Sequence, residues 1–243
     1  MMNSKEKLMY EVMKAIYEQS MPICFKGSMV LKAFLLEAGY VEEVRHTVDI
    51  DANWNSDTPP TADTMVSALQ TAIDKAGINA KVSIYRMYGE GRSAGFTFAD
   101  RETGEELFLM DMDVNRPIPD TQIYEIEGLC FRGVSPTQMI ADKVSAISTE
   151  KVFRRIKDVV DLYYLSKVFS FDKADVLQTL KANGRELDHF QGFLRQPEEL
   201  RHAYEKFRLG GDVHKLPFDE VYAAVKKFLK DVLPKEKSRE QER

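Results

Sequence analysis

The sequence lacks the features that mark several protein classes. Its 243 residues include two cysteines and one tryptophan, and no apolar run approaches the roughly 20 residues that a membrane-spanning helix requires. Residues 1–20 do not look like a signal peptide, because their hydrophobic side chains recur at helical spacing among charged ones. We therefore expect a cytoplasmic protein with no membrane partner.

Cysteine and histidine are too scattered to suggest zinc or nucleophile chemistry. Cys24 and Cys130 lie in apolar, strand-like runs, which favours core thiols, and neither has a Cys or His at metal-ligand spacing. The histidines form no H-x-x-x-H pair and lie near no Ser or Cys arrangement typical of a nucleophile. The spacing of a Walker A loop is also absent. Zinc, triad and P-loop enzymes are therefore disfavoured.

Charge does not single out a partner. Lysine and arginine total 34 against 39 for aspartate and glutamate, and the net charge is −5. This balance neither indicates nor excludes nucleic-acid binding. Positive charge is concentrated locally, above all in "KVFRRIKD" at residues 151–158.

The hydrophobic pattern divides the chain into two parts. Up to residue 135, helical stretches alternate with strands, and from residue 80 a period of two predicts consecutive strands. From residue 136 onward the pattern is helical. We predict an α+β fold: a mixed sheet flanked by helices over residues 1–135, then a helical bundle over 136–233, with a disordered tail at 234–243.

The expected elements follow from the same pattern. Predicted strands cover residues 23–25, 44–50, 80–88, 94–100, 106–114 and two segments of 121–135. Predicted helices cover residues 4–20, 29–39, 64–76, 136–148, 151–168, 173–183, 196–208 and 218–232. The glycine-rich stretch at 89–95 joins two strands, which indicates a hairpin; Arg86 and Arg92 near it could meet a phosphate or an RNA acceptor.

Paired aspartates occupy two of the predicted strands. In "VRHTVDIDANW" Asp49 and Asp51 point to the same side, about 6–7 Å apart along the strand. In "FLMDMDVN" Asp111 and Asp113 do likewise. If these strands are neighbours, three or four carboxylates converge, and such a cluster calls for a cation; oxygen ligands suit Mg²⁺. The alternative is that each pair marks a solvated strand end.

The turn before the first aspartate strand strengthens the cation interpretation. In "ICFKGSMVLKAF" a strand passes through Gly27 and Ser28 into a helix. Glycine lets the backbone approach a ligand, and a helix N-terminus suits a phosphate. The alternative for Ser28 is an ordinary helix N-cap.

Taken together these motifs resemble the AbiEii/AbiGii toxin family of nucleotidyltransferases, within the polymerase-β-like superfamily. The resemblance spans about residues 20 to 170, in the family's motif order, with Thr where the family pattern has Ser before the first aspartate. The matching residues are Gly27, Ser28, Arg45, Thr47, Asp49, Asp51, Asp113, Ala141, Asp142, Lys143, Lys157, Asp158, Asp161, Leu162 and Tyr163.

The resemblance implies a nucleotidyltransferase-type fold and roles for the matched residues. By resemblance Gly27 and Ser28 hold the triphosphate of an NTP, and Asp49 and Asp51 bind Mg²⁺. Asp113 is the implied third carboxylate, which aids metal binding or deprotonates the acceptor. The sequence alone leaves open whether Asp111 takes that place instead.

Two residues of the helical part complete the implied site. Lys143 would reach the phosphates, and Asp158 would orient Lys143 or contact the nucleotide. The alternatives are a solvated helix face for Lys143 and surface pairing of Asp158 and Asp161 with neighbouring basic residues. Asp161 could also simply anchor the helical bundle.

The implied function is Mg²⁺-dependent transfer of a nucleoside monophosphate from an NTP to an acceptor, with tRNA as a candidate. The resemblance also implies a toxin of a toxin–antitoxin or phage-defence pair, with a cognate antitoxin as partner. Residues 151–157 would form a basic patch on the acceptor side. The alternatives are a non-catalytic nucleotide-binding or interaction module of the same fold, and metal-dependent phosphate-ester hydrolysis.

Overall fold

The computed structural model describes residues 3–40, 44–88, 93–114, 118–209 and 213–234. The chain forms two compact units, residues 1–139 with 209–213 and residues 140–208 with 214–243. The predicted disordered tail lies outside the described residues except for residue 234. The predicted domain boundaries stay a prediction.

A seven-stranded mixed sheet forms the first unit, and the predicted α+β fold is confirmed. Its strand order is β3-β4-β5-β2-β1-β7-β6. The strands are β1 (Ile23–Lys26), β2 (Asp49–Trp54), β3 (Ala80–Tyr88), β4 (Ser93–Asp100), β5 (Glu106–Asp113), β6 (Thr121–Ile126) and β7 (Leu129–Val134). β2 is antiparallel to β1 and parallel to β5, so it lies in the middle of the sheet.

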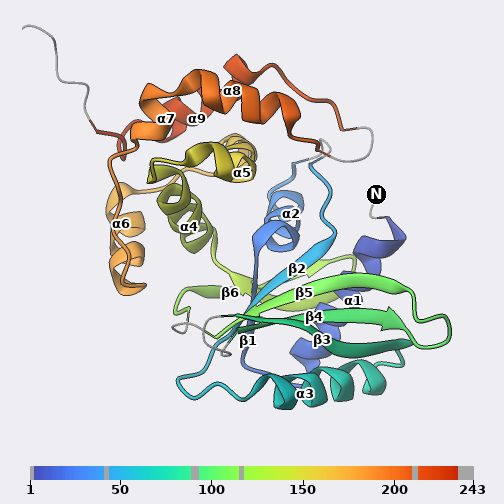
Figure 1. Cartoon of the computed structure of the whole chain (residues 1–243). Helices are drawn as coiled ribbons and strands as arrows, with labels where there is room; N and C mark the ends of the chain where they lie inside the picture. The colour runs from blue at the N-terminus through green and yellow to red at the C-terminus, as the bar shows by residue number, and fades with distance from the viewer. Residues whose placement is uncertain (1–2, 41–43, 89–92, 115–117, 210–212, 235–243) are drawn as a thin grey trace, which may run out of the picture. The chain divides into compact units, whose positions relative to one another are not determined.

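Three helices flank this sheet: α1 (Ser4–Glu18), α2 (Gly27–Glu37) and α3 (Ala62–Lys75). Figure 1 shows α2 beside β2 and α3 beneath β3; α1 packs against α3 and contacts α2, because Tyr10 donates a hydrogen bond to the carbonyl of Met29. The face toward α1 and α3 is the apolar core, because alternate residues of each strand point to it. Its buried side chains include Phe25, Ile50, Phe96, Met110 and Phe131. The opposite face carries the polar residues of β2 and β5.

The first aspartate-bearing strand starts later than predicted. The strand expected at 44–50 begins at Asp49 and continues to Trp54. Among the described residues, the ladder of β2 with β1 begins at Asp51 and its ladder with β5 begins at Asp49, so neither includes residues 44–48. The backbone N–H of His46 instead donates to the carbonyl of Leu209, at 2.9 Å.

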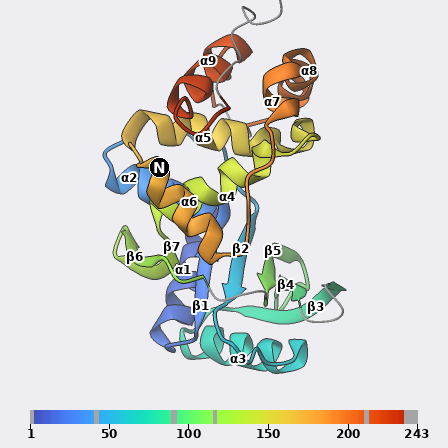
Figure 2. The ribbon, with the colours of Figure 1, turned by 90° about the vertical axis from the view of Figure 1, so that its left-hand side faces the viewer.

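The second unit is helical, as the pattern predicted. Its helices are α4 (Pro136–Ser148), in which the boundary between the units falls, α5 (Ile156–Val168), α6 (Lys173–Ala182), α7 (Gln191–Arg195), α8 (Pro197–Lys206) and α9 (Phe218–Phe228). α5 is buried along most of its length and packs against α8 and α9, as Figure 2 shows for α9. Residues 152–155, predicted as α-helix, form a 3₁₀ turn, and the short α7 was not predicted.

The two cysteines are buried to different degrees. Cys24 is fully buried, as expected of a core thiol, whereas Cys130 is only half-buried and its thiol lies 3.8 Å from the carboxylate of Glu125. The prediction for Cys130 is therefore wrong: it lies on the outer strand pair, β6–β7, away from the covered core. None of the described helices combines the length and apolarity of a membrane span.

A buried acid links α1, α2 and the segment before β2. Glu6 lies in the first turn of α1, where its backbone N–H donates to the side chain of Asn3 at 2.8 Å in a capping box. Its carboxylate is fully buried, 2.7 Å from the ammonium of Lys32 on α2 and 3.3 Å from Nδ1 of His46. Because His46 immediately precedes Thr47, this cluster holds the entry to β2.

Neutralising Glu6 should cost stability in a pH-dependent way. Burial raises the pKa of Glu6, but the hydrogen bond and charge of Lys32, together with hydrogen bonds from Asn3 and His46, outweigh it, so the pKa lies below its ordinary value of 4.5. A depressed pKa stabilises the fold above pH 4.5, and this stabilisation is lost as the pH falls through the lowered pKa. We expect Glu6→Gln to lower the free energy of unfolding by about 3 kcal/mol at pH 7, because the charge of Lys32 stays buried.

Urea unfolding of both proteins from pH 7 to pH 3 measures this difference, which should shrink below pH 4.5. Glu18→Gln is the matched control, since Glu18 is on the same helix but pairs with Lys14 at the surface. It should cost less than about 1 kcal/mol. Equal costs for the two variants would show that the buried cluster does not support the fold.

Candidate active site

Acidic side chains from two adjacent strands share the open face of the sheet. Asp49 and Asp51 of β2 point away from the core that holds Ile50 and Ala52. In the parallel ladder with β5, Asp51 lies directly beside Asp111, and Asn53 lies beside Asp113. Residues paired in this way project to the same face. The two aspartate pairs therefore lie side by side and point in one direction.

The Gly27 turn closes over Asp51. Gly27 has a φ of +73°, which favours glycine, and a Cβ at this position would overlap with the Asp51 carboxylate. The turn and the second aspartate of β2 are therefore in direct contact, because β1 pairs Lys26 with Asp51. Only a residue without a side chain permits this approach.

α2, which begins at this turn, carries no side-chain cap among the described residues. By contrast α1, α3 and α6 are capped by Asn3, Thr61 and Asp172. Ser28 is thus not the N-cap considered as its alternative role. The first N–H groups of α2 have the polarity that suits an anion.

A chain of hydroxyl groups joins the turn to the first aspartate. Ser28 Oγ donates to Thr47 Oγ1 at 2.8 Å, and Thr47 Oγ1 donates to Asp49 Oδ1 at 3.0 Å. Thr47 is almost fully buried, so this chain holds the Asp49 carboxylate in a defined orientation. The residues before β2 therefore act as a support for the aspartate and not as strand.

The two carboxylates of β5 have different partners. Asp113 forms an ion pair with Lys26, the residue before Gly27. Asp111 accepts a hydrogen bond from Tyr85 at 2.8 Å and forms an ion pair with Arg86 at 2.5 Å. Burial and the Asp111 hydrogen bond raise the pKa of Tyr85 to about 12, so at neutral pH its hydroxyl is a donor. Asp113 is thereby tied to the Gly27 turn, and Asp111 to β3.

The donor chemistry of this face fits a magnesium ion. Among the residues that the structure describes, no group of three or more Asp, Glu, His or Cys side chains has the arrangement of a complete metal site. Mg²⁺ does not require one, since it is commonly held by one or two carboxylates together with water and substrate phosphates. Asp49 and Asp51 supply two such carboxylates on one face, beside a turn suited to phosphate.

The other predicted site residues lie in the second unit. Lys143 of α4 is almost fully buried and contacts two carboxylates of α5, Asp161 at 2.6 Å and Asp158 at 3.6 Å. Arg155 Nε lies 2.8 Å from Asp158 Oδ2, although that oxygen accepts no hydrogen bond in the described part of the chain. Lys143 is thus not on a solvated helix face, and its nearer partner is Asp161.

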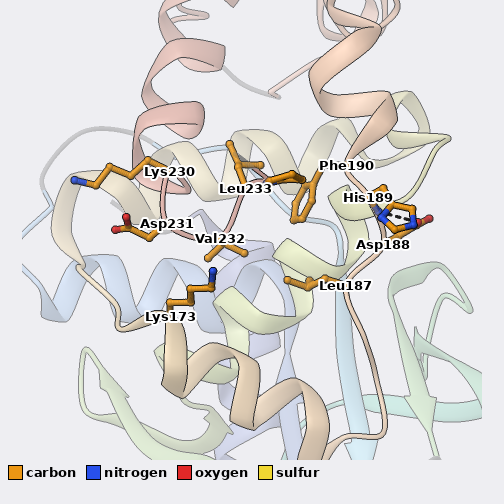
Figure 3. A pocket seen from close by; sticks show the side chains of 10 residues that line it. Lys173, Leu187, Asp188, His189, Phe190, Lys230, Asp231, Val232 and Leu233 are labelled. Carbon is orange, nitrogen blue, oxygen red and sulfur yellow. Dashed lines mark hydrogen bonds between the residues drawn. The ribbon is translucent and has the colours of Figure 1, made fainter. Parts of the chain in front are cut away.

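A pocket of about 320 Å³ also lies in the second unit. Figure 3 shows Phe190, Val232 and Leu233 along it, with the side chains of Lys173 and Lys230 nearby. None of the predicted site residues lines this pocket, and it is not part of the candidate site.

Comparison with models of known protein families identifies the family of this chain. A model of the family described as nucleotidyl transferase AbiEii toxin, type IV TA system, matches residues 7–238. The chain belongs to the AbiEii family of nucleotidyltransferase toxins. The resemblance noted in the sequence is therefore confirmed, and it extends further toward the C-terminus than the motifs alone indicated.

Solved structures show the same fold at low sequence identity. MenT4, a nucleotidyltransferase toxin from Mycobacterium tuberculosis, is 17% identical, with a TM-score of 0.59 over 93% of this chain and 83% of its own. An antigenic nucleotidyltransferase-like protein from Paracoccidioides brasiliensis is 13% identical, with a TM-score of 0.50 over 82% of this chain and 91% of its own. No protein with a curated description matches the chain.

Three residues of the AbiEii-family chain escaped the sequence argument. Lys26 stands next to the Gly27 turn in "FKGS", a position that could have drawn attention to it. Asp161 was weighed as a surface partner of neighbouring basic residues or as an anchor of the bundle, and its contact with Lys143 needs the packing of α4 on α5. The role of Tyr85 had no signal, because it depends on the pairing of β3 with its neighbours. Arg92, which was singled out with Arg86, lies outside the described residues.

Substituting Gly27 should reveal how tightly the turn contacts Asp51. Gly39 is the matched control, because it has a similar φ of +78° but open space around its Cα. We expect Gly39→Ala to cost about 1–2 kcal/mol for the left-handed conformation alone. Gly27→Ala should cost at least about 1 kcal/mol more, as the new methyl group displaces the Asp51 carboxylate. Urea unfolding measures both; equal costs would contradict the contact.

The buried charge cluster of the second unit should behave as a coupled unit. Lys143→Met keeps the aliphatic stem but removes the ammonium from Asp161, which is 1% exposed. We expect a loss of about 3 kcal/mol in the free energy of unfolding. Adding Asp161→Asn should recover part of that loss, which a double-mutant cycle measures.

The exposed pair of Arg185 and Asp142 provides the control for this cycle. Arg185→Met should change stability by less than about 1 kcal/mol. A Lys143→Met variant that is as stable as this control would show that Lys143 does not neutralise a buried carboxylate.

Proposed function

We propose that the protein transfers a nucleoside monophosphate from an NTP to an acceptor and releases pyrophosphate, with tRNA as the candidate acceptor. The observation that carries the proposal is the contact between the Gly27 turn and the Asp51 carboxylate. It brings a helix N-terminus suited to phosphate into contact with a face bearing paired carboxylates. A solvated strand end would not need this approach.

The positions of the first-unit residues support a role for each of them in this transfer. The backbone at Gly27 and Ser28 binds the triphosphate at the start of α2. Asp49 and Asp51 would hold a magnesium ion, which would supply charge neutralisation and a template for the phosphates. Thr47 orients Asp49 through its hydrogen bond. These residues position the α-phosphorus for in-line attack by an acceptor hydroxyl, and pyrophosphate leaves on the opposite side.

Asp113 is the better candidate for the third carboxylate. Its ion pair with Lys26 ties it to the triphosphate turn, whereas Asp111 is tied to Tyr85 and Arg86 on β3. This contact supports Asp113 as the group that aids metal binding or accepts the proton of the attacking hydroxyl. The ammonium of Lys26 compensates the charge of the Asp113 carboxylate.

The second unit contributes through predicted roles that rest on the family pattern. Lys143 supplies a positive charge for the phosphates, and Asp158, with Asp161, orients its ammonium. The basic residues at 151–157 serve the acceptor; Arg154 and Lys157 are exposed there. Membership of a type IV toxin–antitoxin family supports a cognate antitoxin as a partner.

Loss of the β2 carboxylates should abolish transfer without unfolding the protein. We expect Asp49→Asn and Asp51→Asn each to lower transfer of label from an α-³²P-labelled NTP by at least roughly a hundredfold, since the metal stabilises several kcal/mol of transition-state charge. The assay uses total tRNA, protein and small metabolites as acceptors, with each of the four NTPs. Pyrophosphate release is followed in parallel.

Asp57→Asn is the matched control, because Asp57 is exposed in the loop after β2. It should keep full activity. Undiminished labelling in the β2 variants would refute the site. NTP binding with no pyrophosphate release on any acceptor would favour a non-catalytic binding module, and product formation without an acceptor would favour hydrolysis.

A further inference from the structure

An irregularity in β3 turns two consecutive side chains toward the same carboxylate. Ile84 pairs with Phe96 and Arg86 pairs with Gly95, so the register shifts by one residue between them. In a regular strand Tyr85 and Arg86 would point to opposite faces. Here both contact Asp111 on the open face. Bulges of this kind commonly re-aim side chains beside active sites.

The redirected residues form an aromatic and cationic cluster with Tyr88. The guanidinium of Arg86 lies 5.1 Å from the ring centre of Tyr85 and 5.2 Å from that of Tyr88. The Tyr85 ring lies against Gly95, where any Cβ would overlap with it. Tyr88 lies close to Asp113, whose charge, together with burial, raises the pKa of the Tyr88 hydroxyl. The cluster therefore borders both carboxylates of β5.

This cluster is open to solvent. Tyr85 is 39% exposed, and the side chain of Arg86 is 51% exposed. If Tyr85 only stabilised the fold, its exposed ring would not require a glycine at the position beneath it. Aromatic faces and guanidinium planes are what proteins use to stack unpaired nucleobases, largely without regard to sequence, and arginine also pairs with phosphate.

The order of strands assigns this cluster to the acceptor and not to the NTP. The proposed triphosphate turn follows β1, and the carboxylates lie on β2 and β5. The cluster lies on β3, with β4 between it and β5, on the other side of the carboxylates from the turn. In-line displacement needs the attacking and leaving oxygens on opposite sides of the phosphorus. A pyrophosphate leaving at the β1 side thus requires an acceptor arriving from the β3 side.

We propose that Tyr85, Arg86 and Tyr88 bind the unpaired nucleotide end of an RNA acceptor. The inference rests on the proposed nucleotidyl transfer for its direction, and its binding test does not depend on turnover. The rings hold the terminal bases, and Arg86 contacts the backbone phosphate. Asp111 positions Tyr85 and Arg86 on the face where the transfer occurs.

Fluorescence anisotropy with two labelled RNA hairpins tests the proposal, one with a single-stranded 3′ end and one blunt. We expect the protein to prefer the single-stranded end. Tyr85→Ala/Tyr88→Ala should weaken that binding roughly ten- to hundredfold, while NTP binding, measured by thermal shift, stays unchanged. Tyr85→Phe/Tyr88→Phe keeps both rings and should retain most of the RNA affinity.

Met87→Ala is the matched control. Met87 is 56% exposed on the same strand but alternates to the other face, since it pairs with Ala94. It should bind both RNAs like the unaltered protein. Equal affinity of the alanine double variant and the Met87 variant for the single-stranded end would overturn the proposal.

Two other results would overturn it in ways that identify the true ligand. Loss of NTP binding with RNA binding unchanged would assign the cluster to the base of the donor. Label found only on protein, with no preference for the single-stranded RNA, would assign it to a protein acceptor. RNA binding that depends on the rings, without any pyrophosphate release, would instead leave this inference standing and refute the proposed transfer.

Discussion

The repulsion between carboxylates on one face of the sheet is the constraint on which the candidate site depends. β2 lies between an antiparallel and a parallel neighbour, and the ladder with β5 places Asp51 directly beside Asp111. Like charges at this spacing are unfavourable unless cations or hydrogen-bond donors compensate them. Lys26 and Arg86 supply two such cations. The cations around the site are thus arranged to compensate the carboxylates. A bound metal ion would add to this compensation and bring its phosphates to the same face.

The supports of this face are themselves buried and connected to the fold. The hydroxyl chain from Ser28 to Asp49 passes through Thr47, and the neighbouring His46 contacts the buried carboxylate of Glu6. Glu6 in turn fixes the start of α1 and pairs with Lys32 on α2. The orientation of a surface aspartate therefore depends on a core ion pair, so stability and site geometry are linked through one short segment.

Local features of the candidate site could be predicted from the sequence, and its non-local features could not. The alternation around Asp49 and Asp51 and the Gly27 turn are properties of neighbouring residues, and both appear as expected. The start of β2 was misplaced because residues 44–48 have strand-like composition but enter neither ladder of β2 that the described residues form. Amino-acid composition indicates whether a segment can be buried in a sheet. Strand formation also requires a neighbouring strand with which the segment can form hydrogen bonds.

The remaining differences have the same origin. The bulge that turns Tyr85 and Arg86 to one face depends on pairing across β3 and β4. The preference of Lys143 for Asp161 over Asp158 depends on how α4 packs on α5, since both aspartates lie within one turn of the same helix. These features depend on tertiary contacts between elements. The hydrophobic periodicity of a strand, two residues, or of a helix, 3.6 residues, does not determine such contacts.

The strict alternation of β2 also protects the protein against misfolding. A slip of one residue against β1 or β5 would carry Asp49 and Asp51 beneath α1 and α3 and expose Ile50 and Ala52 to water. Unpaired carboxylates in an apolar interior are so unfavourable that the shifted pairing cannot compete with the native one. The same two acids thereby help to specify the register of β2 while the sheet assembles.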